Sequence, residues 1–411
     1  MAAYNEDDDN RRSLLVLHHS ATPRVSNGLP RARVAAALAF VLAWSVPSAA
    51  WSQQTLNIAT WGGAYGRAQQ IALLEPYARK TGTAIATEIY GGNVENVRSL
   101  IKDGKTPVDV VDVSAGALKT LCNEGLLEPL DPESLKTDGD TADDFLPGAI
   151  SKCGVASVAW AMAIVANRKA FQGGPPTTID ALLDTGRFPG KRALPDNAPR
   201  TLELVLLADG VAPGSIYQEL ATPEGADRAF AALDKIKGNV LLWSKPEEPM
   251  AWVITGRAAM AAGYSGRIFR AAVVDRNLEI LWDGQIYDLD AWAIPKSAPN
   301  KDEAMRFIRF ATEPAQLAAQ ARLTSYGPMR TSALAQVGKH PAIGVDMQRF
   351  LPTAPENSRK ALRFDELWWA ENGDALNKRF AAWAASLRAP KTASPEQPKS
   401  NGANAPAASA P

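Results

Sequence analysis

Residues 56–66 read LNIATWGGAYG, in which a short apolar strand runs into an aromatic, glycine-rich turn. The residues that follow have the spacing of a helix, so the segment predicts a strand, a turn and a helix in succession. In α/β sheets, turns at the carboxyl ends of strands are where ligands are held. Trp61, in the middle of the turn, is therefore the first candidate for contact with a ligand.

The same alternation continues downstream. Strands are predicted over 85–90 and 108–113, and a helix closed by a glycine follows each of them. In the helix after the first strand, apolar spacings of three and four place Ala68, Ile71, Leu74 and Ala78 on one face, which we expect to be buried. The resulting order, βαβαβα, predicts a mostly parallel sheet.

Later segments are expected to connect two halves of the chain. Residues 157–167 form an apolar, strand-like run that is long enough to cross between domains. Residues 278–282 and 289–295 predict two more strands around a Trp-Asp-Gly turn.

The N-terminal region predicts export. Two arginines precede an apolar run over 34–46, and small residues follow at 48–50. This is the pattern of a secretory signal peptide, and the run is too short to span a membrane. We therefore expect a signal peptide at 31–52, a periplasmic location, and a mature protein without residues 1–30.

Composition limits the possible partners. Residues 389–411 are rich in Pro, Ala, Ser, Asn and Lys and predict a disordered tail. The roughly 335 residues between signal and tail are enough for two domains. Without residues 1–52, 39 basic and 40 acidic residues remain. This balance provides no basic field for nucleic acid and no polybasic membrane patch.

Histidine and cysteine are nearly absent from the expected mature chain, which keeps only His340, Cys122 and Cys153. Zinc sites based on histidine, Ser-His triads and Cys-His pairs are therefore excluded, and we expect neither an enzyme nor a cofactor or metal. In an oxidising compartment, two cysteines predict one disulfide. The alternative is two buried free thiols.

Aromatic, acidic and arginine side chains recur at predicted strand ends. Aromatic faces attract ammonium groups, and a carboxylate fixes such a group further, so this set suits a small cation. The residues at these ends are Trp61, Tyr90, Ser114, Tyr264, Arg267, Trp282, Asp283, Asp288, Asp290, Trp292 and Tyr326.

Two other patterns have weaker interpretations. Gly62-Gly63-x-x-Gly66 follows a strand but lacks the GxGxxG spacing of a dinucleotide loop. Asp109 and Asp112 are three residues apart in one strand and so point to opposite faces. We expect ordinary structural roles for both aspartates.

The chain resembles the periplasmic solute-binding proteins of ABC importers, in the branch of spermidine/putrescine-binding proteins. The similarity covers about residues 56–385. It rests on the segments ATWGGAYG (59–66), VDVVDVS (108–114), CGVASVAWAMAIVANR (153–168), AAGYSGRIF (261–269), LWDGQIYDLDAWAIP (281–295) and SYGP (325–328).

This resemblance implies a two-lobed α/β fold of the type II periplasmic binding proteins. Each lobe is a mostly parallel sheet flanked by helices, and crossing strands join the lobes. Lobe I would contain 55–160 and 291–335, and lobe II 161–290 and 336–388. The implied partners are a small-molecule ligand and an ABC permease with its ATPase, and the protein is expected to be a monomer.

Positions matched to the family carry roles with them. The resemblance implies that Trp61 is an aromatic wall, that Ser114 faces the ligand and that Tyr264 replaces a family tryptophan. It also implies that Asp290 binds an amine and that Tyr326 matches a tyrosine after the late helices. The full set of expected ligand-binding residues is Trp61, Ser114, Tyr264, Arg267, Asp288, Asp290, Trp292 and Tyr326.

Departures from the family pattern change the expected ligand chemistry. Asp288 stands where polyamine binders carry a tryptophan, and Asn197 and Arg200 stand near the place of a second family carboxylate. Arg200 and Arg267 would suit a ligand carboxylate, which arginine binds by paired hydrogen bonds.

Three hypotheses remain open at this point. The leading one is a receptor for a polyamine-like cation of the putrescine/spermidine class. The alternative is a receptor for a zwitterionic or carboxylated molecule, such as an amino acid, held by arginine. A third, from another class, is an exported hydrolase that uses carboxylates alone.

The mature protein is expected to begin between Trp51 and Gln53, because the apolar run and the small residues specify cleavage there. Mass spectrometry of the protein from a periplasmic extract measures its N-terminus. Recovery of peptides from residues 4–30 would contradict this expectation.

Overall fold

The computed structural model describes residues 55–91, 93–104, 106–136 and 144–388 of the 411-residue chain. The predicted signal peptide, the residues before it and the predicted tail lie outside the described residues. In the part that is described, no helix is both long and apolar enough to cross a membrane.

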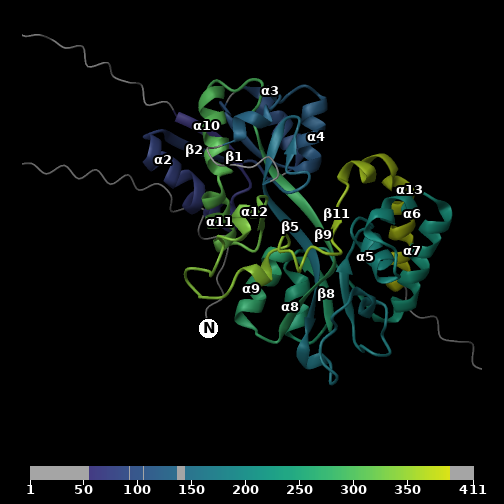
Figure 1. Ribbon diagram of the computed structural model, residues 1–411. Helices are drawn as coiled ribbons and strands as arrows, with labels where there is room; N and C mark the ends of the chain where they lie inside the picture. The colour runs from purple at the N-terminus through teal and green to yellow at the C-terminus, as the bar shows by residue number, and fades with distance from the viewer. Residues whose placement is uncertain (1–54, 92, 105, 137–143, 389–411) are drawn as a thin grey trace, which may run out of the picture. The chain divides into compact units, whose positions relative to one another are not determined.

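The described strands form an 11-stranded mixed sheet flanked by helices (Figure 1). Its main path is β2-β1-β3-β9-β5-β8-β6-β7, with β4 and β10 paired to β5 and β11 paired to β9. The strands are β1 (Thr55–Thr60), β2 (Ala84–Ile89), β3 (Val110–Ser114), β4 (Ile150–Ser151), β5 (Gly154–Asn167), β6 (Arg192–Pro195), β7 (Val240–Trp243), β8 (Met260–Tyr264), β9 (Leu278–Ala293), β10 (Gly327–Pro328) and β11 (Leu362–Arg363).

Helices follow most of these strands. The first is α1 (Gly63–Gln69), which continues through a π-helical turn (Gln70–Leu74) into α2 (Glu75–Thr81). The others are α3 (Val94–Asp103), α4 (Ala115–Asn123), α5 (Thr201–Ala208), α6 (Ile216–Leu220), α7 (Pro223–Ile236), α8 (Glu248–Ile254), α9 (Ser265–Val274), α10 (Lys301–Ala311), α11 (Pro314–Leu323), α12 (Thr331–Leu334) and α13 (Glu366–Arg388). Short 3₁₀ turns span Pro132–Leu135, Arg168–Ala170, Ile179–Leu182, Pro213–Ser215, Lys237–Asn239 and Gln348–Phe350.

The predicted βαβαβα unit is confirmed. β1 pairs in parallel with β2 on one side and with β3 on the other. Gly82 and Gly104 follow α2 and α3 with φ angles of 76° and 59°, which glycine adopts without steric cost. Because β1 and β3 run in parallel, the turn at Trp61 and the strand end at Ser114 lie at the same edge of the sheet.

The predicted buried face of the first helix is wrong at Ile71, whose side chain is 51% exposed. The π-helical turn at Gln70–Leu74 interrupts the α-helix there. A π turn holds more residues than an α turn, so it rotates the side chains out of the expected register. Ala68 and Leu74, on either side of Ile71, are buried as predicted.

The longest pairing in the sheet joins β5 to β9. These antiparallel strands pair from Gly154 opposite Ala293 to Asn167 opposite Leu278, with register shifts between Ala156 and Val158 and between Met162 and Ile164, and they lie side by side in Figure 1. At one end β9 also pairs with β3, and at the other β5 pairs with β8. The two strands therefore connect the part of the sheet that contains β1–β3 with the part that contains β6–β8.

The two strands predicted around a Trp-Asp-Gly turn are in fact one strand, β9. The turn sequence forms an irregularity within this strand. The segment of β9 from Leu281 to Ile286 lies opposite the shorter segment of β5 from Met162 to Ile164. Gly284 has a φ of 73°, and a Cβ at this position would lie 2.3 Å from the side chain of Ile179. Glycine here permits both the backbone conformation and the close packing.

Buried apolar residues form separate cores. One core combines residues from 162–286 with residues from 362–384. Two others combine residues from 56–155 with residues from 291–311, and a further core packs Phe269 against residues from 317–354. Each lobe is thus built from segments that are distant in the sequence.

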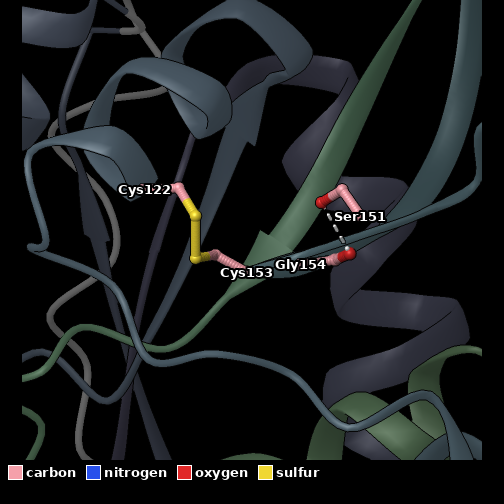
Figure 2. Close-up of a disulfide and its surroundings, with 4 residues drawn as sticks. All are labelled: Cys122, Ser151, Cys153 and Gly154. Atoms are coloured by element: carbon pink, nitrogen blue, oxygen red, sulfur yellow. Dashed lines mark hydrogen bonds between the residues drawn. A yellow bond between two sulfur atoms is a disulfide. The ribbon is translucent and has the colours of Figure 1, made fainter.

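The predicted disulfide is confirmed. Cys122 at the end of α4 is bonded to Cys153 just before β5, with their Cα atoms 5.9 Å apart (Figure 2). Nearby, Ser151 Oγ donates a hydrogen bond of 3.0 Å to the carbonyl of Gly154 and closes the turn between β4 and β5. The disulfide thus attaches α4 to the start of a crossing strand.

Replacing Cys122 and Cys153 together by serine should lower the free energy of unfolding by about 3–4 kcal/mol, because a loop between residues 31 positions apart is no longer closed in the unfolded chain. Denaturant titration of oxidised wild-type and double-variant protein measures this difference. An unchanged unfolding midpoint would contradict the stabilising role.

Candidate ligand-binding site

Four polar side chains share one face of the sheet where β3 meets β9. Ser114 pairs with Asp290 and Asp112 pairs with Trp292 across these strands. Paired and alternate residues point to the same side, so Asp112, Ser114, Asp288 and Asp290 lie on one face. The predicted site residues Ser114, Asp288 and Asp290 are therefore brought together.

Asp290 and Asp112 are buried carboxylates with raised pKa values. Burial raises the pKa of Asp290 well above its ordinary value, and the charges of Asp112 and Asp288 raise it further. Burial raises the pKa of Asp112 to about 7. Hydrogen bonds to its carboxylate, of which that from Gln69 has the largest effect, act in the opposite direction. Gln69 Nε2 donates to Asp112 Oδ2 at 2.6 Å, whereas Asp112 Oδ1 has no hydrogen-bond partner among the described residues.

The structural role predicted for Asp112 is therefore incomplete. Asp109 does have such a role, because its carboxylate accepts hydrogen bonds from the backbone N–H groups of Asn57 and Asn300. Asp112 instead lies beside Asp290. The available signal was its place inside an otherwise apolar strand, since a buried charge needs a partner or a function.

Aromatic rings surround the acidic groups. Trp160 Nε1 donates to Asp290 Oδ1 at 3.2 Å, and the Trp160 ring lies 5.6 Å from the ring of Tyr264. Trp61 lies 5.7 Å from Tyr90, whose hydroxyl donates to the backbone carbonyl of Asp112. The site thus includes Trp160, which sequence analysis placed only in a crossing strand.

Tyr326 lies between charges of opposite sign. Its ring is 5.5 Å from that of Tyr65. Burial raises the pKa of Tyr326, the charge of Asp290 raises it further, and the charges of Arg270 and Arg267 lower it. The predicted residue Tyr326 is therefore close enough to both Asp290 and Arg267 for their charges to act on it.

Arg200 adds a second positive group. Its guanidinium lies 3.7 Å from the centre of the Phe364 ring and 5.2 Å from that of Trp160. Arg200 Nη2 is 3.7 Å from Asp288 Oδ2, and burial raises the pKa of Asp288 to about 6. Arg200 Nε is buried without a hydrogen-bond partner in the part of the chain that is described.

Arg200 also has an unusual backbone. Among the described residues other than glycine, it alone has a positive φ, at 67°. Such a conformation costs about 1–3 kcal/mol and persists where the surrounding structure imposes it, often at functional sites. The strained backbone, the aromatic stacking and the unpaired Nε all favour a role in ligand binding.

Two of the predicted site residues, Trp292 and Ser114, make contacts with other parts of the protein instead. Trp292 is fully buried and packs edge-on against Phe307, 5.5 Å away, in the core of its lobe. Ser114 Oγ accepts a hydrogen bond from the backbone N–H of Ala117 and donates to Glu366 at 3.3 Å, so its hydroxyl caps α4. Trp292 therefore acts through packing, and Ser114 already has partners in this structure.

A cavity of about 600 Å³ borders this group of residues. Asp288, Phe364 and Tyr217 line it, together with the first turn of α4. This volume is ample for a small metabolite. No group of three or more His, Cys, Asp or Glu residues within the described ranges is arranged to hold a metal ion.

Comparisons with known proteins identify the family. Residues 72–345 match the bacterial extracellular solute-binding protein family. The chain is 38% identical over 346 residues to the gamma-aminobutyric acid (GABA)-binding protein of Pseudomonas aeruginosa, covering 84% of this chain and 95% of that protein. It is 25% identical over 259 residues to the spermidine/putrescine-binding periplasmic protein of Salmonella typhimurium, covering 59% of this chain and 69% of that protein.

A solved structure of a GABA receptor shows the same fold. It is 27% identical to this chain and superposes with a TM-score of 0.65, over 80% of this chain and 98% of the receptor. The chain therefore belongs to the bacterial extracellular solute-binding protein family, as the substrate-binding protein of an ABC transporter.

Proposed function

We propose that this protein is a receptor for a small zwitterion of the ω-amino acid type, such as GABA. The observation that carries the proposal is the placement of Trp160, whose indole contacts Asp290 through its N–H and Arg200 through its ring. An acidic group suited to an ammonium and a basic group suited to a carboxylate thus both contact one aromatic residue. A ligand with one charge of each sign fits both.

Asp290 binds the ammonium group in this proposal. Its carboxylate is buried beside Asp112 and Asp288, and the three acids repel one another when ionised. A bound ammonium relieves this repulsion. The neighbouring rings of Trp160, Tyr264 and Tyr326 present the π faces that favour a cation.

Arg200 binds the carboxylate, with Arg267 contributing from the side of Tyr326. Asp288 already occupies part of the Arg200 guanidinium, but Nε lacks a partner. A buried donor without an acceptor is costly, so a ligand carboxylate at this position supplies the missing hydrogen bond.

The comparisons support the zwitterion over the polyamine that was the leading hypothesis from sequence. Similarity to the GABA-binding protein is both higher and more extensive than similarity to the spermidine/putrescine-binding protein. A diamine would also bring a second cation towards Arg200, which disfavours it.

The remaining features of the proposal follow the family. We propose that the protein is exported to the periplasm by its signal peptide and acts as a monomer without enzymatic activity. It delivers its ligand to a permease driven by an ATPase. The residues expected to contact the ligand are Trp61, Trp160, Arg200, Tyr264, Arg267, Asp290 and Tyr326, with Asp112 and Asp288 close by.

Two variants should distinguish how the protein binds the ammonium group of the ligand from how it binds the carboxylate. Asp290→Asn should weaken binding of both GABA and n-butylamine at least tenfold, because losing a buried charge partner costs about 2–5 kcal/mol. Arg200→Ala should weaken GABA binding similarly and leave n-butylamine, which lacks the carboxylate, almost unaffected. Calorimetry measures both affinities, with the exposed Arg276→Ala as control. Putrescine binding more tightly than GABA to the wild type, together with indifference of GABA to Arg200→Ala, would refute the proposal.

Affinity for GABA should also rise with pH. Asp112 and Asp290 have raised pKa values, so at low pH they carry protons that an ammonium ligand must displace. Between pH 7.5 and 5.5, affinity is expected to fall by about tenfold or more as Asp112, whose pKa is about 7, becomes protonated. Calorimetry in buffers of different ionisation enthalpy should detect proton release on binding. A flat pH profile would contradict the assignment of the ammonium to this pair.

A further inference from the structure

Gln69 is a buried amide beside the binding site that the proposed function does not use. It is the last residue of α1, and its side chain is fully inaccessible to solvent. A buried amide is costly unless its donor and its acceptor are both hydrogen-bonded. The partners of Gln69 therefore indicate what it does.

Both ends of this amide are hydrogen-bonded to other buried side chains. Thr60 Oγ1, at the end of β1, donates to Gln69 Oε1 at 2.5 Å, and Gln69 Nε2 donates to Asp112 Oδ2 at 2.6 Å. An ionised carboxylate accepts hydrogen bonds and donates none, so the amide N–H must face the aspartate and the amide oxygen the threonine. The orientation of the Gln69 side chain is thereby fixed.

The π-helical turn that follows Gln69 explains how its side chain can point inward. The backbone N–H of Glu75 donates to the carbonyl of Gln70, five residues earlier, which is the hydrogen bond of a π turn. Gln69 and Leu74 are both buried, although residues five positions apart on a regular α-helix point about 140° away from each other. The wider turn thus allows Leu74 to pack in the core while Gln69 contacts Asp112.

The other oxygen of Asp112 lacks a partner of this kind. Asp112 Oδ1 is buried without a hydrogen bond from any residue that the structure describes. Asp112 pairs with Trp292 and Asp290 pairs with Ser114, so the two aspartates are diagonal neighbours on one face of the sheet. Such neighbours are about 7–8 Å apart, which leaves room for one ammonium group between their two carboxylates.

We propose that Gln69 is a positioning residue: it holds Oδ2 of Asp112 so that Oδ1 faces the ammonium group of the ligand beside Asp290. Thr60 orients the Gln69 amide in turn, and Asp112 becomes a second ammonium-binding residue. This inference rests on the proposed function, because it concerns the ammonium end of the same site. It does not depend on the contacts of the carboxylate end.

Other titratable groups are close enough for their charges to interact with Asp112. They are Asp290 on β9, Tyr65 on α1 and Tyr90 after β2. Burial raises the pKa of both tyrosines, so they stay protonated between about pH 5.5 and pH 9. Within this group, a change in the pH dependence of ligand binding over that range therefore reports on the two aspartates.

The test uses Gln69→Leu, which preserves the approximate size of the side chain but removes the amide. A hydrogen bond to an ionised carboxylate lowers its pKa, so its loss should raise the pKa of Asp112 by about 1. Binding of GABA and of n-butylamine by the full mature protein should weaken about fivefold at about pH 7 and return to within about twofold of wild type at about pH 9. Calorimetry across this range measures the shift. Equal weakening at every pH would overturn the inference, because it is the result of general damage to the site.

Thr60→Val is a milder form of the same test. It keeps Gln69 and the shape of residue 60 but removes the hydroxyl that orients the amide. We expect the pH profile of GABA binding to shift in the same direction by a smaller amount. A profile identical to that of the wild type would count against the inference, and this variant decides the question if Gln69→Leu does not yield folded protein.

Asn57→Leu is the matched control. Asn57 Nδ2 also donates to a buried aspartate next to β3, Asp109 Oδ2 at 3.1 Å, but Asp109 has a structural role, since it accepts from the backbone N–H groups of Asn57 and Asn300. This variant should leave GABA affinity and its pH profile unchanged. A shift equal to that of Gln69→Leu would mean that the loss of any amide near β3 disturbs the site, which would overturn the specific role of Gln69.

A double-variant cycle completes the test. In the Asp112→Asn background, Gln69→Leu should have almost no further effect on GABA binding at about pH 7, because the carboxylate that it positions is gone. An effect as large as in the wild-type background would contradict the inference. If the wild type binds GABA more tightly than putrescine but Gln69→Leu has no effect, the inference fails while the proposed function stands. If Asp290→Asn leaves GABA and n-butylamine binding unchanged, the ammonium end is misplaced and both fail.

Discussion

The antiparallel pairing of β5 with β9 is the constraint on which the rest of the structure depends. The two strands pair over almost their whole length, with an unbroken register from Val158 to Met162, and each also pairs with different neighbours. Backbone hydrogen bonds along a buried ladder leave little freedom to slide, since a shift of one residue would turn every side chain to the other face. The positions of Trp160, Asp288 and Asp290 relative to one another are thereby fixed.

This fixed register brings several carboxylates together in a buried region, where a negative charge is energetically costly. Asp288 and Asp290 occupy alternate positions of β9, and β3 adds Asp112 to the same face. Buried acids so close to each other retain protons more strongly than free carboxyls do. The surrounding hydrogen bonds, from Trp160 to Asp290 and from Gln69 to Asp112, compensate for only part of this cost. The negative charge of these carboxylates is only partly compensated by the protein. This uncompensated charge is a physical basis for binding a cation.

The positive side of the site is supported by a different part of the chain. Arg200 depends on elements far away in sequence: Phe364 for stacking and Asp288 for an ion pair. In the proposed site, the ammonium of the zwitterion lies against strand β9 and its carboxylate against Arg200, just before α5.

The sequence by itself determined the local elements, the disulfide and the family. Hydrophobic spacing specifies strands and helices, because it reflects the geometry of a single segment, and two cysteines in an oxidising compartment leave one pairing. Motif position also predicted Asp290, Tyr264 and Tyr326 as ligand-binding residues, and this stays a prediction. The tertiary structure alone decided that Trp292 packs in a core, that Asp112 is close enough for its charge to act on Asp290 and that Arg200 is strained and stacked. Burial, pKa and side-chain contacts depend on which distant segments meet, and that information is absent from the period of any single segment.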